Sequence, residues 1–119
     1  DLACLVLADL SLSTDANVSQ DQKVIDVIRD SLMLFAEALT QVGDCYAMYG
    51  FSSVRRSAIR YQELKSFSTR YDDTVRARID AIRPGDYTRL GAAVRYSTQL
   101  LAEQPNRQKL LLILMPFQP

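Results

Sequence analysis

Histidine is absent from the 119-residue sequence, and its absence removes whole classes of chemistry. Ser-His and Cys-His nucleophilic catalysis both need an imidazole as the general base. The usual zinc ligand set also depends on histidine. We therefore expect neither a histidine-dependent hydrolase nor a zinc-binding domain.

An excess of charge of one sign and a long apolar run are missing as well. Lys plus Arg and Asp plus Glu each number 14, so the net charge does not recruit nucleic acid or an anionic membrane. No apolar stretch reaches the roughly 18 residues that a membrane helix needs, and the amino end lacks the basic-then-apolar order of a signal peptide. The sequence therefore predicts a cytoplasmic protein that binds no nucleic acid and does not insert into a membrane.

Cysteine is scarce, with two residues in the chain. Cys4 and Cys45 both lie inside apolar runs, which predicts buried free thiols in a reducing compartment. The alternative is a disulfide, but neither cysteine lies in the loop-rich context that is typical of a small, disulfide-bonded secreted domain. With 48% apolar residues, residues 1–119 form one small domain with a core of its own.

The stretch from Leu5 to Asp15 organises the chain. Its apolar run is typical of a strand buried on both faces, and it ends at Asp9. Asp9, Ser11 and Ser13 follow in a D-x-S-x-S pattern of hard oxygen ligands, which suits a magnesium-sized cation. Ligands bind at this end of the strands in open α/β sheets. In the alternative interpretation, these side chains cap the loop by hydrogen bonding to local backbone N–H groups.

The remaining elements follow from hydrophobic periodicity and from start and stop signals. A strand, a helix and a second strand in succession predict a right-handed crossover and a parallel pair. Thr88 occupies an N-cap position, and its alternative role is that of a metal ligand from a second loop. The expected elements are a helix from the capping box Ser19–Gln22 to Gly43, a strand over 44–51, a polar loop over 52–57, an edge strand around Ile59, Tyr61 and Leu64, a short helix capped by Asp72 or Asp73 that ends at Pro84-Gly85, a helix after Thr88, and a strand over 110–115.

Basic residues gather in the middle of the chain, at Arg55, Arg56, Lys65 and Arg70. They predict either a docking patch for an acidic partner or a solvated face of the domain.

Taken together, these segments resemble a von Willebrand factor A-type domain over essentially the whole chain. Asp9-x-Ser11-x-Ser13 and Thr88 resemble the metal-ion-dependent adhesion site of that family. The amino-acid sequence of several stretches is similar to that of the carboxy-terminal A domain of the nitric oxide reductase activation protein D family and its rubisco-activating relatives. These stretches are Asp9–Asp15, Tyr49–Ser53, Tyr71–Asp73 and Arg83–Ala93.

The resemblance implies a doubly wound α/β fold: a mostly parallel sheet with helices on both faces and strand order 3-2-1-4-5-6. It also implies that Ser11, Ser13 and Thr88 coordinate Mg²⁺, with Mn²⁺ as a substitute, and that Asp9 holds the ion directly or through water. A carboxylate of a client metalloenzyme would take the open position.

The end of the chain departs from this pattern. A Thr-Asp-Gly turn is expected after the strand over 110–114, where the sequence reads Met115-Pro116-Phe117. We therefore expect an incomplete domain, truncated after the fourth strand, that binds Mg²⁺ weakly. Without a fifth strand, the apolar edge over 109–115 should pair with a second copy in a homodimer.

The function implied by the resemblance is a non-enzymatic, metal-dependent protein-binding module. Such a module would serve as the adaptor of a MoxR-type AAA+ ATPase in the maturation of a metalloenzyme such as nitric oxide reductase. The alternatives are a degenerate scaffold without metal, or a haloacid dehalogenase-type phosphotransferase. The phosphotransferase needs a second aspartate where Ser11 stands.

Overall fold

The computed structural model describes residues 2–10, 18–43, 45–55, 58–82 and 90–115. They form four strands and three helices, in the chain order β1 (Leu2–Asp9), α1 (Val18–Val42), β2 (Cys45–Arg55), β3 (Ala58–Lys65), α2 (Asp73–Asp80), α3 (Leu90–Ala102) and β4 (Gln108–Leu114). None of the helices in these ranges is long and apolar enough to cross a membrane.

The four strands form one mixed sheet in the order β3-β2-β1-β4. Strand β1 pairs in parallel with β2 and with β4, while β3 pairs antiparallel with β2. This arrangement confirms a mostly parallel sheet whose first strand is central and whose strand over 110–114 lies beside it. The prediction that the strand around Tyr61 forms an edge is confirmed too.

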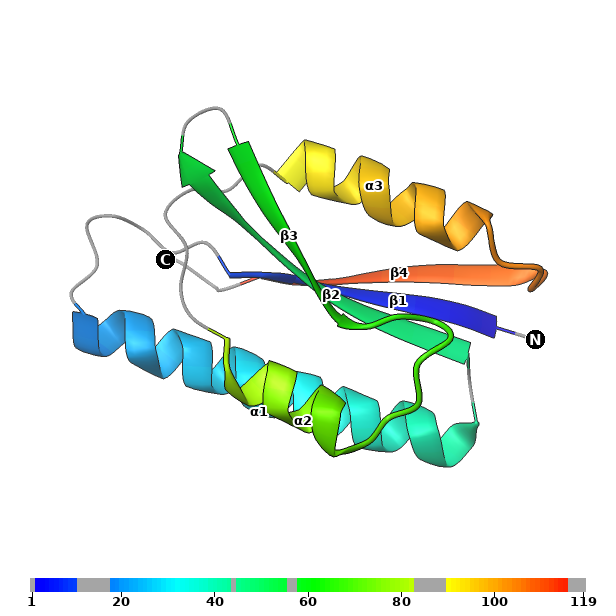
Figure 1. Ribbon diagram of the computed structural model, residues 1–119, viewed down its shortest axis with the longest axis horizontal. Coiled ribbons are helices and arrows are strands. Elements are labelled where there is room, and N and C mark those ends of the chain that lie inside the picture. Colours follow the sequence, from blue (N-terminus) through cyan, green and yellow to red (C-terminus); the bar gives the residue numbers. More distant parts are fainter. Residues whose placement is uncertain (1, 11–17, 44, 56–57, 83–89, 116–119) are drawn as a thin grey trace.

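Helices cover both faces of this sheet: α1 and α2 lie on one face and α3 on the other (Figure 1). Because side chains alternate along a strand, β1 contributes to a core on each side. Cys4, Val6 and Ala8 pack in the core under α1 and α2, whereas Leu5 and Leu7 pack in the core under α3. Every residue from Ala3 to Asp9 is buried, as the apolar run predicts.

Helix α1 covers the sheet with one apolar stripe, formed by Ile25, Ile28, Leu32 and Ala36, because these residues recur every three or four positions. The predicted stop at Gly43 is confirmed. Its φ of 83° is a left-handed conformation that glycine adopts without strain, and its N–H donates to the carbonyl oxygens of Leu39 and Thr40 at 3.1 Å. The helix begins at Val18, so Ser19 lies within the helix and is not its N-cap.

Helix α2 begins as predicted, with Asp72 as its N-cap. The Asp72 carboxylate accepts hydrogen bonds from the backbone N–H groups of Thr74 and Val75 at 3.0 and 3.2 Å. The helix ends at Asp80, and the expected stop at Pro84-Gly85 lies outside the described residues.

The polar loop expected over 52–57 is wrong for its first four residues. Strand β2 continues to Arg55, where Ser52 pairs with Arg60 and Arg55 with Ala58 of β3. The antiparallel partner supplies backbone hydrogen bonds to polar residues that have no apolar pattern of their own. As a result, β2 and β3 extend past the last β1–β2 pair, Asp9–Phe51.

Candidate metal centre at the carboxyl end of the sheet

Asp9 is the last residue of β1 and pairs with Phe51 of β2. It is 2% exposed, and the alternation along β1 places it on the same face as Leu7, toward α3. Carboxylates are rarely buried to this extent unless other groups compensate their charge. The burial of the Asp9 carboxylate therefore implies compensating interactions, and it places the predicted ligand at the carboxyl end of β1.

Two helices begin at the end of the sheet where β1 finishes. Figure 1 shows the first turns of α1 and α3 at this end, toward which the parallel strands β1, β2 and β4 run. Unpaired N–H groups at helix starts favour negative charge nearby. Helix starts at this end of the sheet would thus favour an acidic group of a partner electrostatically.

The backbone after Asp9 is fixed by a contact that the sequence did not reveal. The Leu10 N–H donates to the Phe51 carbonyl oxygen at 2.9 Å, which extends the ladder one residue past β1. The Leu10 side chain packs over Gly50, where an added Cβ would lie 2.5 Å from Leu10 Cδ1. A glycine at position 50 is therefore required for Leu10 to lie flat against β2.

Of the four predicted metal ligands, Asp9 is the one that the structure describes; Ser11, Ser13 and Thr88 lie outside the described residues. Among the residues that are described, no group of three or more His, Cys, Asp or Glu side chains could hold a metal ion. One carboxylate and three hydroxyls are hard oxygen donors and fit Mg²⁺ in chemical type. The fit rests on that donor chemistry together with the burial of Asp9.

A tyrosine cluster lies on the same face of the sheet, two strands from Asp9. Tyr61 of β3 pairs with Phe51, so that Asp9, Phe51 and Tyr61 form one row across the sheet. The Tyr61 ring stacks on Tyr49 with 4.9 Å between centroids and meets the edge of Tyr96 at 4.5 Å. A cavity of about 220 Å³ lies between Tyr61, Tyr96 and the first residues of α3, Ala92 and Ala93.

The Tyr61 hydroxyl is 2.7 Å from the Ser97 hydroxyl of α3, and Ser97 is fully buried. Burial raises the pKa of Tyr61 well above its usual value of 10, against the lowering effect of the Ser97 hydrogen bond. Burial, together with the nearby Glu63 carboxylate, raises the pKa of Tyr49 to about 12. Both phenols are therefore neutral at physiological pH.

This cluster was not predicted from the sequence, although one signal for it was present. Ser97 lies four residues from both Ala93 and Leu101, a helical spacing that favours the inner face of α3, and a buried hydroxyl needs a hydrogen-bond partner. The tyrosines of β2 and β3 were the available hydroxyls.

Lys65 is not part of an exposed basic patch. It is 4% exposed, and its Nζ donates to the carbonyl oxygens of Tyr46 and Ser66 at 2.8 and 3.1 Å. The ammonium lies 4.1 Å from the centroid of the Tyr46 ring, and burial lowers the pKa of Lys65. Arg70 is exposed, and Arg56 lies outside the described residues.

Both cysteines are free thiols, as predicted. Cys4 is buried in the core under α1, whereas Cys45 is half-buried at the start of β2, where its Sγ lies 4.0 Å from Gln104 Oε1. The prediction of full burial is therefore wrong for Cys45, because the end of the strand leaves one side of the residue open.

Comparison with known proteins gives no match to a protein-family profile. The whole chain is similar to Protein NorD of Stutzerimonas stutzeri, at 56% identity, and to Protein NorD of Brucella abortus, at 46% identity. The chain spans 19% of the length of each of these relatives. Among solved structures, a mutant of the PilB minor pilin from Streptococcus sanguinis shares the fold, with a TM-score of 0.71 and 22% identity over 95% of this chain and 29% of the pilin chain.

Proposed function

We propose that this chain is a non-enzymatic, metal-dependent protein-binding module that takes part in the activation of nitric oxide reductase. The observation that carries the proposal is the similarity of the entire chain to proteins named NorD, at 46–56% identity. Identity at this level over every element of the sheet supports a shared role for this part of the protein. The motifs that resemble the nitric oxide reductase activation family lead to the same role.

In this proposal the chain is a von Willebrand factor A-type domain whose ligand site lies at the carboxyl end of β1. The position and burial of Asp9 support it. Asp9, Ser11, Ser13 and Thr88 would hold Mg²⁺, with Mn²⁺ as a substitute. The ion would supply an open coordination position and positive charge for a carboxylate of the client.

The role of the chain's own residues is to present this site. Strand β1 fixes Asp9, and the Leu10–Phe51 hydrogen bond orients the backbone that leads to Ser11. The starts of α1 and α3 favour an approaching acidic side chain electrostatically. Mg²⁺ keeps several waters and takes few protein carboxylates. Because the proposed ligands of this chain include one carboxylate, the bound ion would gain a strong charge interaction with the incoming carboxylate of the partner.

The partners in this proposal are a MoxR-type AAA+ ATPase and the client metalloenzyme, and the chain itself would be cytoplasmic. The module would act as the adaptor that brings the ATPase to its client. In this proposal the chain neither binds nucleic acid nor inserts into a membrane.

The test is a pair of titrations and a pull-down. Isothermal titration of the 119-residue chain with Mg²⁺ and Mn²⁺ should show binding weaker than micromolar, because the cage has one carboxylate. A purified MoxR-type AAA+ ATPase should be retained by the immobilised chain in Mg²⁺ and lost in EDTA.

The decisive variant is Asp9→Asn, which keeps the shape of the side chain and removes its charge. Asp30→Asn is the matched control, because Asp30 is exposed on α1. Retention should disappear in Asp9→Asn and persist in Asp30→Asn. Retention that needs neither Mg²⁺ nor Asp9 would support the degenerate scaffold instead, and metal binding at micromolar strength or tighter would show that the ligand set is wrong.

A further inference from the structure

The cavity beside Tyr61, which we call the tyrosine cavity, lies between β3 and the first two turns of α3. Its volume is about 220 Å³, and the described residues that line it are Tyr61, Ala92, Ala93 and Tyr96. Tyr96 is 50% exposed, so solvent reaches the cavity past this side chain. The two alanines leave space that larger side chains at the start of α3 would fill.

The wall that β3 contributes to the tyrosine cavity is held in place by contacts on two sides. The Tyr61 ring stacks on Tyr49, and its hydroxyl lies 2.7 Å from the buried Ser97 hydroxyl. Because this wall is already ordered, a ligand would bind without the cost of ordering it. An apolar cavity of about 150 Å³ can hold a benzene molecule, so the tyrosine cavity has room for a leucine side chain.

The tyrosine cavity lies on the same face of the sheet as Asp9. Asp9 pairs with Phe51, and Phe51 pairs with Tyr61, so the three residues form one row. Neighbouring strands are about 4.8 Å apart, which places the backbones of Asp9 and Tyr61 about 10 Å apart. Three residues of an extended chain span about the same distance. One short segment of a partner can therefore reach both the end of β1 and the tyrosine cavity.

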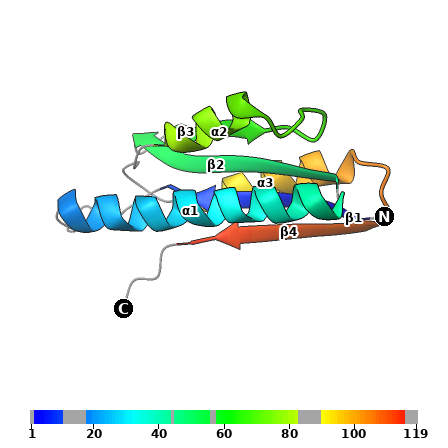
Figure 2. The ribbon, with the colours of Figure 1, turned by 90° about the horizontal axis from the view of Figure 1, so that it is seen from below.

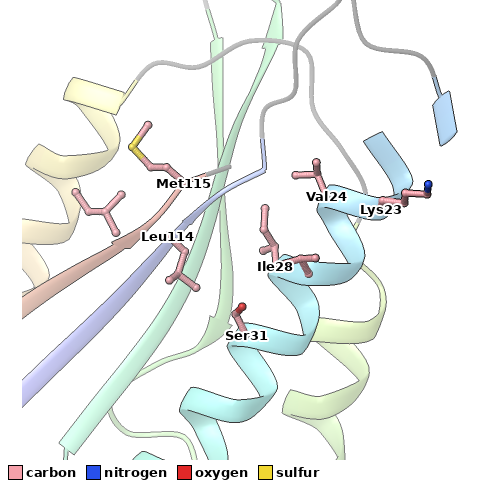
Figure 3. Close-up of a pocket in the computed structure, with 8 residues that line it drawn as sticks. Lys23, Val24, Ile28, Ser31, Leu114 and Met115 are labelled. Atoms are coloured by element: carbon pink, nitrogen blue, oxygen red, sulfur yellow. The ribbon is translucent and has the colours of Figure 1, made fainter. Parts of the chain in front are cut away.

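A larger apolar groove lies at the other edge of the sheet. Figure 2 shows β3 and β4 at opposite edges. The groove has a volume of about 510 Å³, and Figure 3 shows Ile28 and Ser31 of α1 facing Leu114 and Met115. The strand order that the family resemblance implies places a further strand beside β4, so this groove is not a candidate binding surface. The same order leaves β3 as the outer strand, and the tyrosine cavity therefore does not depend on strands that follow β4.

We propose that the tyrosine cavity binds an apolar side chain of the same partner segment that presents its carboxylate at the end of β1. This inference rests on the proposed function, because it adds a second contact for the same client. The partner segment would carry leucine, or a side chain of similar size, about three residues from its aspartate or glutamate. The acidic residue makes binding depend on the metal, and the apolar residue makes it specific, because a buried side chain in a rigid cavity contributes most to discrimination.

The test compares two synthetic peptides, Leu-Gly-Gly-Asp-Gly-Gly-Leu and Ala-Gly-Gly-Asp-Gly-Gly-Ala, in titrations of the 119-residue chain followed by NMR. Leucine on both sides of the aspartate allows either direction of the partner chain. In Mg²⁺, the leucine peptide should bind at least about tenfold more tightly, because a buried leucine removes more apolar surface from water than an alanine does. It should also shift the signals of Ala92, Ala93 and Tyr96. Equal binding of the two peptides would overturn the proposal.

Two variants of α3 locate the contact. Ala92→Leu fills the tyrosine cavity and should abolish the preference for leucine. Ala102→Leu is the matched control, because Ala102 is exposed at the other end of α3, and the preference should persist. A preference that survives Ala92→Leu, or that is lost in folded Ala102→Leu, would overturn the proposal.

Removal of the metal separates this inference from the proposed function. EDTA should weaken both peptides by the same factor and leave the ratio of their affinities unchanged. If EDTA changes neither affinity, the metal-dependent function is wrong, whereas the leucine preference still decides whether the tyrosine cavity binds an apolar side chain.

Discussion

Gly50→Ala tests how the sheet positions the backbone of the candidate metal centre. The new methyl carbon would lie 2.5 Å from Leu10 Cδ1 and 3.2 Å from Leu10 Cγ, whereas ordinary contacts begin near 3.4 Å. The Leu10 side chain must therefore retreat by about 1 Å at its tip. Because Leu10 directly follows Asp9 and is almost fully buried, its retreat strains the backbone beside the carboxylate.

The cost follows from two opposing effects. Overpacking a core costs about 1–3 kcal/mol, while replacing glycine by alanine in a strand regains about 0.5–1 kcal/mol. We expect a net loss of about 0.5–2 kcal/mol in the free energy of unfolding. For a chain of this length, that loss lowers the Tm by about 2–8 °C.

Urea denaturation of Gly50→Ala, Leu10→Ala and the double variant measures the coupling between the two side chains. Gly50→Ala should cost about 1 kcal/mol less when Leu10 has already been shortened, because the clash is then absent. Gly43→Ala is the control: its cost arises from a φ of 83°, nothing lies within 4 Å of its added Cβ, and the ligand site should be unaffected. Equal costs of Gly50→Ala in both backgrounds would refute the reasoning.

Three further predictions concern the tyrosine cluster, the pH dependence and a helix start. Tyr61→Phe should cost about 1–2 kcal/mol by removing the hydrogen bond to the buried Ser97, and adding Ser97→Ala should recover part of this loss in thermal melts. The folded-state pKa of Tyr49 is about 12, above its unfolded value of 10, so its contribution to stability is complete below pH 10 and is lost toward pH 12. Tyrosinate absorbance will follow the ionisation, and circular dichroism will follow the loss of structure. Asp72→Ala should cost about 1 kcal/mol through loss of the N-cap, whereas Asp73→Ala should cost under about 0.5 kcal/mol, because its ion pair is exposed; urea denaturation distinguishes the two.

The sequence predicted the parts of the fold that depend on local patterns. The apolar run over Leu5–Ala8 marks a strand buried on both faces, and the spacing of Ile25, Ile28 and Leu32 marks the inner face of α1. Strand order followed from the right-handed crossover rule and the family resemblance. Gly43 and Asp72 end and begin helices through contacts within a few residues, so they too were predictable.

Features that depend on residues far apart in the chain were not predictable in this way. Arg55 extends β2 because β3 pairs with it, and Lys65 is buried because the carbonyl oxygen and ring of Tyr46 compensate its charge. Contacts of this kind join residues far apart in the chain, so they produce no periodic hydrophobic pattern in the sequence. At the candidate site, the structure places Asp9 at the end of β1, while coordination of an ion by Asp9, Ser11, Ser13 and Thr88 remains a prediction.

The pairing of β1 with β4 has a consequence for how the chain folds. Leu2 pairs with Gln108, so the second side of the central strand is completed by a segment made long after it. Parallel pairs between distant segments form slowly, because a long loop must close before any contact is gained. On the ribosome, β1 and β2 can pair while β4 is still unsynthesised, and one edge of the most apolar strand then stays open. A nascent chain paused before residue 108 should therefore be the species that aggregates or binds chaperones most readily.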